Sequence, residues 1–339
     1  EYRYRGASPK NYVTFNNEVW RIMGIFPTDD GTGKIENRIK LIRNESIGSF
    51  SWDDGTTAYN YSGQDNLLLI NDNNMSKTDF LERKDNYDII MTVAEPVACV
   101  ACSNDWTRPS SLNTYLSGTY LTGLTSTAQN MIGNAKYYLG GYNSGLEFQK
   151  DVMYKYERKI SGSTYYYSSN PKSWTGKLTL MYASDYGYAA SDECTKNLNN
   201  YDNTTCKNNN WLFNNASQWT LLQDASYSFD AFLVGSGGVV SHGAVTGNQI
   251  GVRPTLYLKS NVQIMDGDGT SSNPYVLALD GKVVLPVIDE FSVVSAGYKF
   301  KVTQGTYPIE SYCTLDNDSN IDNCNWVSKV TSCATEKAN

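Results

Sequence analysis

The sequence predicts an α+β domain of two short helices and many short strands over residues 1–281, followed by a small all-β domain over residues 282–339. Short stretches of alternating apolar and polar residues recur along most of the chain, as in half-buried strands. Two segments between residues 110 and 136 instead space their apolar residues three and four apart, as in amphipathic helices. After Asp280-Gly281-Lys282 only strand patterns follow, at residues 283–294 and 298–303.

The composition excludes several classes of protein. Hydrophobic residues make up 40% of the 339 residues, which is enough for a folded core. No apolar run approaches the roughly 18 residues of a transmembrane helix, so we expect no membrane insertion of this segment. There are 28 Lys and Arg against 35 Asp and Glu without a basic tract, which argues against a nucleic-acid partner. A single histidine leaves few zinc or acid–base sites.

The neutral polar composition is typical of a contact surface. Charged residues are only 19% of the chain, whereas Tyr (26) and Gly (27) are abundant beside many Asn, Ser and Thr. These residue types form the adaptable surfaces of binding loops. The same composition also suits a phage, pilus or wall protein whose surface is merely hydrated, and it does not decide between the two.

The N-terminal part predicts a β-hairpin. Residues 12–15 and 19–26 alternate apolar and polar side chains on either side of Asn16-Asn17-Glu18. In the second strand, period-two geometry places four residues on one face: Trp20, Ile22, Gly24 and Phe26.

The hairpin is followed by more strands and then by a polar segment. Residues 38–43 repeat the alternating pattern, and residues 47–55 end in the turn sequence Asp53-Asp54-Gly55. The stretch 56–88 is polar and rich in Asn and Asp, so we expect a long loop or insertion there.

Two helices are predicted in the middle of the domain. The first follows Pro109 with Ser110 or Ser111 as its N-cap, and its apolar residues have helical spacing: Leu112, Tyr115, Leu116 and Tyr120. The second spans residues 125–136 and precedes Leu139-Gly140-Gly141, which is a helix-end signal.

Short strands return in the second half of the domain. They are predicted at residues 179–183, 211–213, 218–222, 231–234, 238–241, 251–259 and 274–279. Asp266-Gly-Asp268-Gly-Thr270 predicts a turn rather than a calcium loop, because calcium takes six to eight oxygens and no Glu stands at the twelfth position from Asp266.

The seven cysteines indicate an oxidising compartment. Two pairs flank polar loops at spacings that suit disulfides, namely Cys194 with Cys206 and Cys313 with Cys324. Cys99 and Cys102 form a disulfide or stay as two thiols, because no second such pair or nearby His completes a metal site. The odd number leaves one thiol over, for which Cys333 is a candidate. Since the chain starts at Glu1 without Met or signal sequence, we expect an export signal and an anchor outside it, and an extracellular, cell-surface location.

Seven segments within residues 1–279 form an ordered series: Asn11-Tyr-Val-Thr-Phe-Asn-Asn-Glu-Val-Trp-Arg-Ile, Ser103-Asn-Asp-Trp-Thr-Arg-Pro-Ser-Ser-Leu-Asn-Thr-Tyr-Leu, Tyr138-Leu-Gly-Gly, Ser184-Asp-Tyr-Gly-Tyr, Gln218-Trp-Thr-Leu, Gly251-Val-Arg-Pro-Thr-Leu-Tyr-Leu-Lys-Ser and Gly267-Asp-Gly-Thr-Ser-Ser-Asn-Pro-Tyr. The series resembles a family of surface-protein domains of unknown function from Gram-positive gut bacteria.

More distantly, this family resembles C-type-lectin-fold domains of the formylglycine-generating-enzyme type. The same fold is used by variable proteins of diversity-generating retroelements in phage tail tips and bacterial surface displays. The resemblance rests on the two helices, the mixed strands and the closing strand at Gly251-Val252-Arg253-Pro254. The part from residue 282 is similar to the start of a bacterial immunoglobulin-like repeat, here truncated, as found in adhesin stalks.

The resemblance implies a ligand-binding face in residues 221–250, just before the closing strand. Period-two geometry places Phe232 and Val234 inward and Leu233 and Gly235 outward. The candidate ligand-binding residues are Gln223, Asp224, Ser226, Tyr227, Ser228, Asp230, Leu233, Ser236, Ser241, His242, Thr246 and Asn248. The implied partner is a protein or glycan on another cell or on a phage or host surface. The alternative is an ordinary solvated hairpin.

Two other groups of residues are interpreted as structural. Four tryptophans are expected in the core rather than in a sugar-stacking platform: Trp20, Trp106, Trp211 and Trp219. Arg253 is expected to be a buried structural arginine that pairs with an acid such as Asp185.

No catalytic residue and no metal site are assigned. A Ser–His–Asp or Cys–His arrangement would have to use His242, and no Gly-x-Ser-x-Gly motif accompanies it. Formylglycine-type chemistry needs paired catalytic cysteines, whereas Cys194 and Cys206 more simply form a disulfide. A pair of glycosidase carboxylates stays open, because their approach is purely three-dimensional. The usual calcium-lectin triplets are not found, so no cofactor is assigned, although calcium stays open.

The sequence therefore predicts a non-enzymatic, adhesin-like binding or display protein of the cell surface, with residues 221–250 as its ligand-binding face and a retroelement-diversified variable protein as one form of it. Two alternatives are kept. One is a carbohydrate-active or sulfatase-modifying-type enzyme, and the other is a structural pilus or wall subunit.

Overall fold

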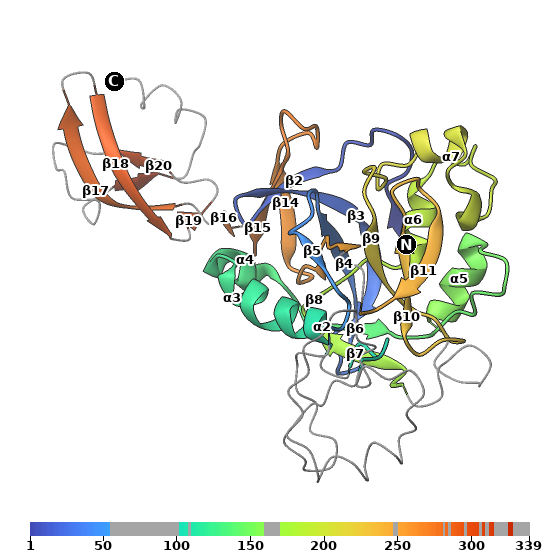
Figure 1. Cartoon of the computed structure of the whole chain (residues 1–339). Coiled ribbons are helices and arrows are strands. Elements are labelled where there is room, and N and C mark those ends of the chain that lie inside the picture. Colours follow the sequence, from blue (N-terminus) through green and yellow to red (C-terminus); the bar gives the residue numbers. More distant parts are fainter. Residues whose placement is uncertain are drawn as a thin grey trace, which may run out of the picture.

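The computed structural model describes the following residues: 1–54, 102–107, 110–158, 170–246 and 250–280, and beyond them the backbone of short strands between residues 282 and 327. Helices and many strands in several sheets confirm the α+β class (Figure 1). The predicted loop at residues 56–88 lies outside the described residues. Among the helices that are described, none has the length and apolar character needed to span a bilayer.

The larger sheet has ten strands and contains the predicted N-terminal hairpin. Its main path is β19 (Tyr307–Pro308), β16 (Lys282–Val283), β15 (Tyr275–Leu279), β2 (Tyr12–Phe15), β3 (Glu18–Asp29), β4 (Ile35–Arg43), β13 (Thr255–Tyr257) and β8 (Leu178–Thr179). Two further strands pair beside this path, β1 (Tyr2–Arg3) with β3 and β14 (Val262–Asp266) with β15.

Two asparagines form the turn of the β2–β3 hairpin. Phe15 pairs with Glu18, which leaves Asn16 and Asn17 as the loop. Their φ angles are 56° and 58°. A two-residue type I′ turn requires positive φ at both positions, and Asn adopts it with less strain than most residues. Trp20, Ile22 and Phe26 of β3 are buried, but so are Arg21 and Met23 between them. A bulge between Ile22 and Gly24 shifts the register of β3, so the prediction of one alternating inward face was wrong.

The smaller sheet has five strands and carries the predicted binding segment. Its order is β11 (Val240–Ala244), β10 (Asp230–Val234), β9 (Gln218–Gln223), β12 (Ile250–Gly251) and β5 (Ser49–Phe50). The strands β10 and β11 form an antiparallel hairpin, and β11 is the edge strand. A separate two-stranded sheet pairs β6 (Ala135–Tyr138) with β7 (Ser173–Gly176).

The predicted strand at residues 251–259 is two strands in two different sheets. β12 belongs to the smaller sheet and β13 to the larger one. Val252-Arg253-Pro254 connects them, and Pro254 lacks the N–H that a continuous ladder would need there. The prediction of one closing strand was therefore wrong in detail, although both of its halves are strands.

The first predicted helix is confirmed with Ser110 as its N-cap. The Ser110 hydroxyl accepts from the Asn113 amide, and the helix runs through α2 (Ser111–Tyr115), the π-helix η1 (Leu116–Tyr120) and α3 (Leu121–Gly123). The second predicted helix is shorter than expected. The helix α4 (Ser126–Met131) is capped by Thr125, and residues 135 and 136 already belong to β6.

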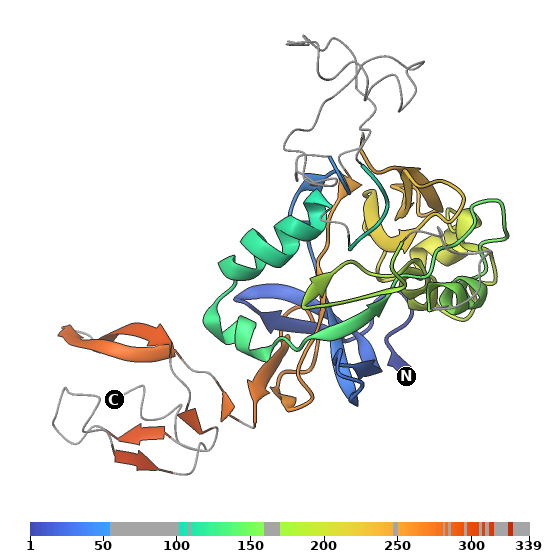
Figure 2. The ribbon, with the colours of Figure 1, turned by 90° about the horizontal axis from the view of Figure 1, so that it is seen from below.

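Further helices were not predicted. They are α5 (Lys150–Glu157), α6 (Ala183–Ala189), the 3-10 turn η2 (Leu198–Asn200) and α7 (Thr204–Asn208). Residues 180–183, 211–213 and 238–239 were expected in strands but are not in strands. Residue 183 begins α6, and residues 211 and 212 form a turn. The spacing of apolar residues could not reveal α6, because nearly all of its side chains are buried and it has no polar face. Helices α2 to α4 and α5 to α7 lie on opposite sides of the strands in both views (Figures 1 and 2).

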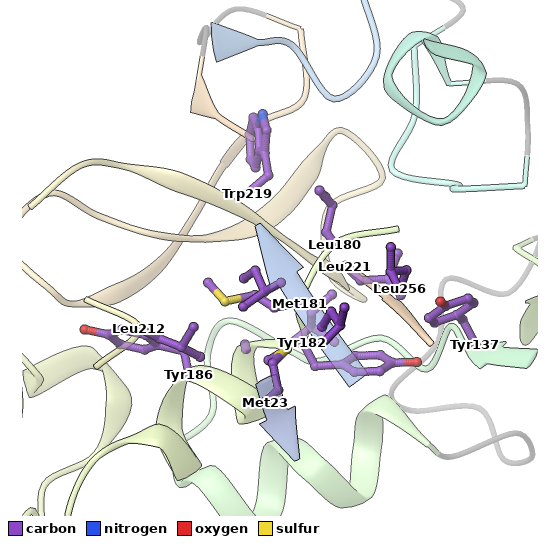
Figure 3. Packing of buried hydrophobic residues seen from close by; sticks show 14 of the residues in the cluster. Met23, Tyr137, Leu180, Met181, Tyr182, Tyr186, Leu212, Trp219, Leu221 and Leu256 are labelled. Carbon is purple, nitrogen blue, oxygen red and sulfur yellow. The ribbon is translucent and has the colours of Figure 1, made fainter. Parts of the chain in front are cut away.

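The four tryptophans are in the core, as expected. Their exposed fractions are at most 7%. Trp52 packs edge-to-face against two other rings, with centroid distances of 5.1 Å to Trp106 and 5.9 Å to Trp219. Figure 3 shows part of this core, where Met181, Leu221 and Leu256 come from distant segments of the chain.

Arg253 is buried as expected, but it does not pair with Asp185. Its guanidinium donates instead to the carbonyls of Arg43 and Leu212, at 2.9 and 3.1 Å. Burial lowers the pKa of Arg253 to about 10. The expected pairing with Asp185 was therefore wrong, because backbone carbonyls accept the hydrogen bonds of this guanidinium and Asp185 pairs with other cations.

Asp185 instead joins a buried ion cluster. It lies 2.5 Å from the Lys40 ammonium and 2.7 Å from the Arg3 guanidinium. Burial alone would raise the pKa of Asp185, but the neighbouring Lys40, Arg3 and Arg158 outweigh it and hold the pKa well below its usual range. The cluster connects β1, β4 and α6.

The C-terminal part contains strands, as predicted. The strands β17 (Pro286–Val294) and β18 (Gly297–Gln304) pair antiparallel, as do β20 (Tyr312–Thr314) and β21 (Asn325–Val327). Its immunoglobulin-like identity and the domain boundary at residue 281 stay predictions.

Candidate functional site

The candidate site is built on the loop between β9 and β10. This loop closes on itself, because the Asp224 amide donates to the Asp230 carbonyl at 3.0 Å and the Asp230 amide donates to the Tyr227 carbonyl at 3.1 Å. The Asp224 carboxylate accepts from the Ser226 amide at 2.7 Å, the Asx-turn contact that Asp commonly makes two residues on. The loop therefore owes its shape to Asp224.

Three ionisable side chains meet beside this loop, and we call them the Asp–Asp–His cluster: Asp224, Asp230 and His242. His242 Nδ1 lies 2.7 Å from Asp230 Oδ2 and 3.4 Å from Asp224 Oδ2. The side chains differ in exposure, at 0% for Asp224, 23% for Asp230 and 34% for His242. The cluster thus has a closed inner side and an open outer side.

The cluster carries excess negative charge. Asp224 Oδ2 is buried and accepts no hydrogen bond. In the part of the chain that the structure describes, neither carboxylate forms an ion pair with Lys or Arg. A buried carboxylate oxygen without a donor is costly, so a cation at this position is favoured.

One buried asparagine fixes the loop from below. The amide nitrogen of Asn104 lies 2.8, 3.0 and 2.8 Å from the backbone carbonyls of Asp224, Tyr227 and Asp230, which share its two hydrogens. Its oxygen accepts from Asn170 at 3.0 Å. Because one side chain holds three points of the loop, the residues above it have a defined position.

The exposed side of the loop is aromatic. Tyr227 is 57% exposed and Phe229 is 50% exposed. The Tyr227 ring lies parallel to the His242 ring, with a centroid distance of 6.1 Å and an interplanar angle of 2°. We call these exposed residues and the outer side of the cluster the hairpin face: Ser226, Tyr227, Phe229, Asp230 and His242.

Most of the predicted ligand-binding residues lie at this end of the β10–β11 hairpin. Those at least partly exposed there are Ser226, Tyr227, Ser228, Asp230, His242 and Thr246. Ser241 is half-buried one position further along β11, opposite Leu233. Ser236 is exposed, but it lies in the turn at the other end of the hairpin. Asn248 lies outside the described residues.

Three predicted contact residues are buried instead. Gln223 donates to the Leu139 carbonyl at 2.6 Å and accepts from Asn170, so it supports the loop from within. Asp224 lies beneath the face for the reason given above. Leu233, expected outward, is only 8% exposed, because β10 is an inner strand and both of its faces are covered.

The Asp266–Thr270 segment is a turn, as predicted. Gly267 and Gly269 have positive φ angles of 84° and 74°. The Asp268 carboxylate accepts from the amide and the hydroxyl of Thr270, at 2.9 and 2.7 Å. The Oδ1 atom of Asp268 is therefore hydrogen-bonded within the turn itself.

The predicted disulfide between Cys194 and Cys206 is present. Both residues are buried, and Cys206 lies in α7. Cys102 is also disulfide-bonded. The side chains of the remaining cysteines, and with them the predicted Cys313–Cys324 pair, lie outside what the structure describes.

The sequence reasoning missed Asn104, Asn170 and Phe229. Asn104 belongs to the Ser103-Asn-Asp-Trp segment that carried part of the resemblance, but nothing local indicates that it contacts a loop 120 residues away. Phe229 was the detectable signal, since an aromatic residue between turn residues is commonly exposed for contact.

Comparison with known families, proteins and structures found no match for this chain. Neither a protein-family model, nor a curated protein, nor a solved structure matches this chain at a significant level. The similarity to surface-protein domains of Gram-positive gut bacteria therefore stays a prediction from the sequence segments quoted above.

Proposed function

We propose that this chain is an extracellular binding module of a cell surface, which recognises a protein or glycan partner through the hairpin face. The observation that carries the proposal is the exposed pair Tyr227 and Phe229 on a loop held by Asn104. Exposed aromatic rings on a preorganised support bind with little loss of conformational entropy.

The arrangement of the carboxylates favours binding over turnover. Asp224 and Asp230 approach each other closely, as a glycosidase pair would. However, the Asp224 side chain is fully buried, and its Oδ2 lies 3.4 Å from His242 Nδ1. Likewise, Cys194 and Cys206 are bonded to each other rather than poised as a catalytic thiol pair.

A cell-surface location is part of the proposal. Buried disulfides form and persist in oxidising compartments, and the Cys194–Cys206 bond supports such a setting. If the chain is one of a set of diversified sibling proteins, variation is expected at Tyr227, Phe229 and His242. In every sibling, buried position 223 is expected to keep an amide side chain, as in Gln223, and buried position 233 an apolar one, as in Leu233.

The experiment compares the wild type with one triple variant and one double control variant on the same probes. A glycan array and an array of purified bacterial and host surface proteins are probed with the wild type and with Tyr227→Ala/Phe229→Ala/His242→Ala. The control is Tyr2→Ala/Ile35→Ala, which removes side chains that are 78% and 67% exposed elsewhere on the surface.

We expect the face variant to lose at least about tenfold in affinity while the control binds like the wild type. Melting temperatures should agree within a few degrees, because the removed side chains are exposed or, for His242, partly exposed. Equal binding by the face variant contradicts the proposal. Glycan turnover that disappears in His242→Ala would establish the enzyme alternative, and self-assembly without any bound probe would establish the structural subunit.

A further inference from the structure

We propose that the Asp–Asp–His cluster is a binding site for a divalent transition-metal ion, with Zn²⁺ or Mn²⁺ as the ions that suit its ligands. Asp224 and Asp230 would supply one carboxylate oxygen each, and His242 would supply Nδ1. This inference goes beyond the proposed function and does not depend on it, because the ion can bind whether or not a partner does.

The geometry is close to that of a three-ligand site. The three ligand atoms lie within 4.8 Å of one another. Two ligands on one Zn²⁺ ion, each about 2.0–2.2 Å from it, lie about 3.3 Å apart in a tetrahedral site. The 3.4 Å between Asp224 Oδ2 and His242 Nδ1 already meets this value. The 2.7 Å between Asp230 Oδ2 and His242 Nδ1 is a hydrogen-bond distance and must lengthen slightly.

The charge of the cluster gives an independent reason. Asp224 Oδ2 is fully buried, points toward His242 and accepts no hydrogen bond. A protonated His242 would compensate one of the two carboxylates, whereas a divalent ion compensates both and replaces the missing donor at Asp224 Oδ2.

The ligands are held by the surrounding chain, as in most metal sites. The second oxygen of Asp224, Oδ1, accepts from the Ser226 amide, which fixes the carboxylate plane. The Asn104 amide holds the backbone of both Asp224 and Asp230. Such outer contacts orient ligands before the ion arrives.

The open side of the cluster provides access and free coordination positions. His242 and Asp230 are 34% and 23% exposed, so an ion can enter from solvent. Three protein ligands leave at least one position for water or for an oxygen donor of a partner.

The mixture of ligands discriminates among ions. Imidazole suits Zn²⁺ and other transition ions, and carboxylates suit Mn²⁺ as well. Ca²⁺ takes six to eight oxygens, and this cluster offers two carboxylates and a nitrogen. We therefore expect Ca²⁺ and Mg²⁺ to bind at least about tenfold more weakly than Zn²⁺.

The test exploits the single histidine of the chain. The untagged full-length protein is stripped with a chelator and titrated with Zn²⁺, and the imidazole nitrogens are followed by ¹⁵N NMR. Since only His242 contributes such signals, a large shift of its Nδ1 resonance at one equivalent reports coordination directly. Calorimetry with Zn²⁺, Mn²⁺ and Ca²⁺ gives the stoichiometry and the order of affinities.

Three variants complete the experiment. His242→Ala and Asp230→Asn alter partly exposed ligands and should each lower Zn²⁺ affinity at least about tenfold. Asp268→Asn alters a carboxylate in the β14–β15 turn and should leave the affinity unchanged. An unshifted His242 signal at millimolar Zn²⁺ in folded protein overturns the inference, as does equal affinity in His242→Ala. The double variant Tyr227→Ala/Phe229→Ala keeps all three proposed ligands and separates the two proposals. Zn²⁺ binding with unchanged partner binding in this variant overturns only the proposed function, and lost partner binding in a protein that binds no Zn²⁺ overturns only this inference.

Discussion

The clearest test of how the site is supported is the substitution Asn104→Ala. Asn104 is fully buried, and its amide contacts three carbonyls of the loop that carries the hairpin face. The substitution removes these contacts without touching any exposed residue. It therefore separates the support of the loop from the surface chemistry of the loop.

The expected cost follows from the donors that are left. The carbonyls of Tyr227 and Asp230 each keep a backbone amide donor, so the Asp224 carbonyl is the group most affected. Leaving one buried carbonyl unsatisfied costs about 1–3 kcal/mol, and the lost contact to Asn170 and the small cavity bring the total to about 2–4 kcal/mol. If the loss acts locally, the loop amides should exchange at least about 30-fold faster, since about 1.4 kcal/mol corresponds to a factor of ten.

Hydrogen exchange measures this residue by residue. The informative amides are those of Asp224, Ser226 and Asp230, whose hydrogen bonds lie within the loop. The control is Asn11→Ala, another fully buried asparagine, which donates to the Ile22 carbonyl at 2.8 Å and has no hydrogen bond to the loop. Unchanged exchange of the loop amides in Asn104→Ala, or equally faster exchange of these amides in Asn11→Ala, would refute the reasoning.

Two further predictions concern stability. Replacing Cys194 and Cys206 by Ser opens a link across 12 residues and should cost about 3 kcal/mol, seen as a lower urea midpoint; an unchanged midpoint under oxidising conditions would contradict the bond. Asp185→Asn should cost about 3–5 kcal/mol at pH 7, because Lys40 is left buried with reduced compensation. The pKa of Asp185 is lowered in the folded state, so its ion pairs stabilise the fold fully above about pH 4 and less as the pH falls further. The difference in stability between wild type and variant should therefore shrink in acid denaturation curves. A constant difference down to pH 2 would show that Asp185 is not charged in the fold.

The local patterns of the sequence predicted some elements well. The β2–β3 hairpin and the Ser110 cap depend on neighbouring residues, so turn chemistry and spacing were sufficient. The same local patterns predicted a second helix that extends into β6, and they did not predict α6. Those segments are decided by burial on all sides, which overrides the period of the apolar residues.

The candidate site shows the same division. Residues 221–250 were predicted as a contact segment, and the loop end of that segment is exposed, with Tyr227 and His242 side by side. The period-two argument failed for Leu233 because it assumes one solvated face, whereas β10 is covered on both. Arg253 was correctly expected to be buried, but its partners are carbonyls brought there by the strand connection.

By itself, the sequence determined what depends on neighbours along the chain: the mixed class, the hairpin turns, the disulfide between Cys194 and Cys206, and the segment that carries the face. Only the tertiary structure decided which side chains of that segment reach solvent. It also brought Asn104 beneath the loop and Asp224 beside His242. The physical reason is that burial and charge compensation depend on which distant strands pack together, and these distances are not encoded in any local pattern.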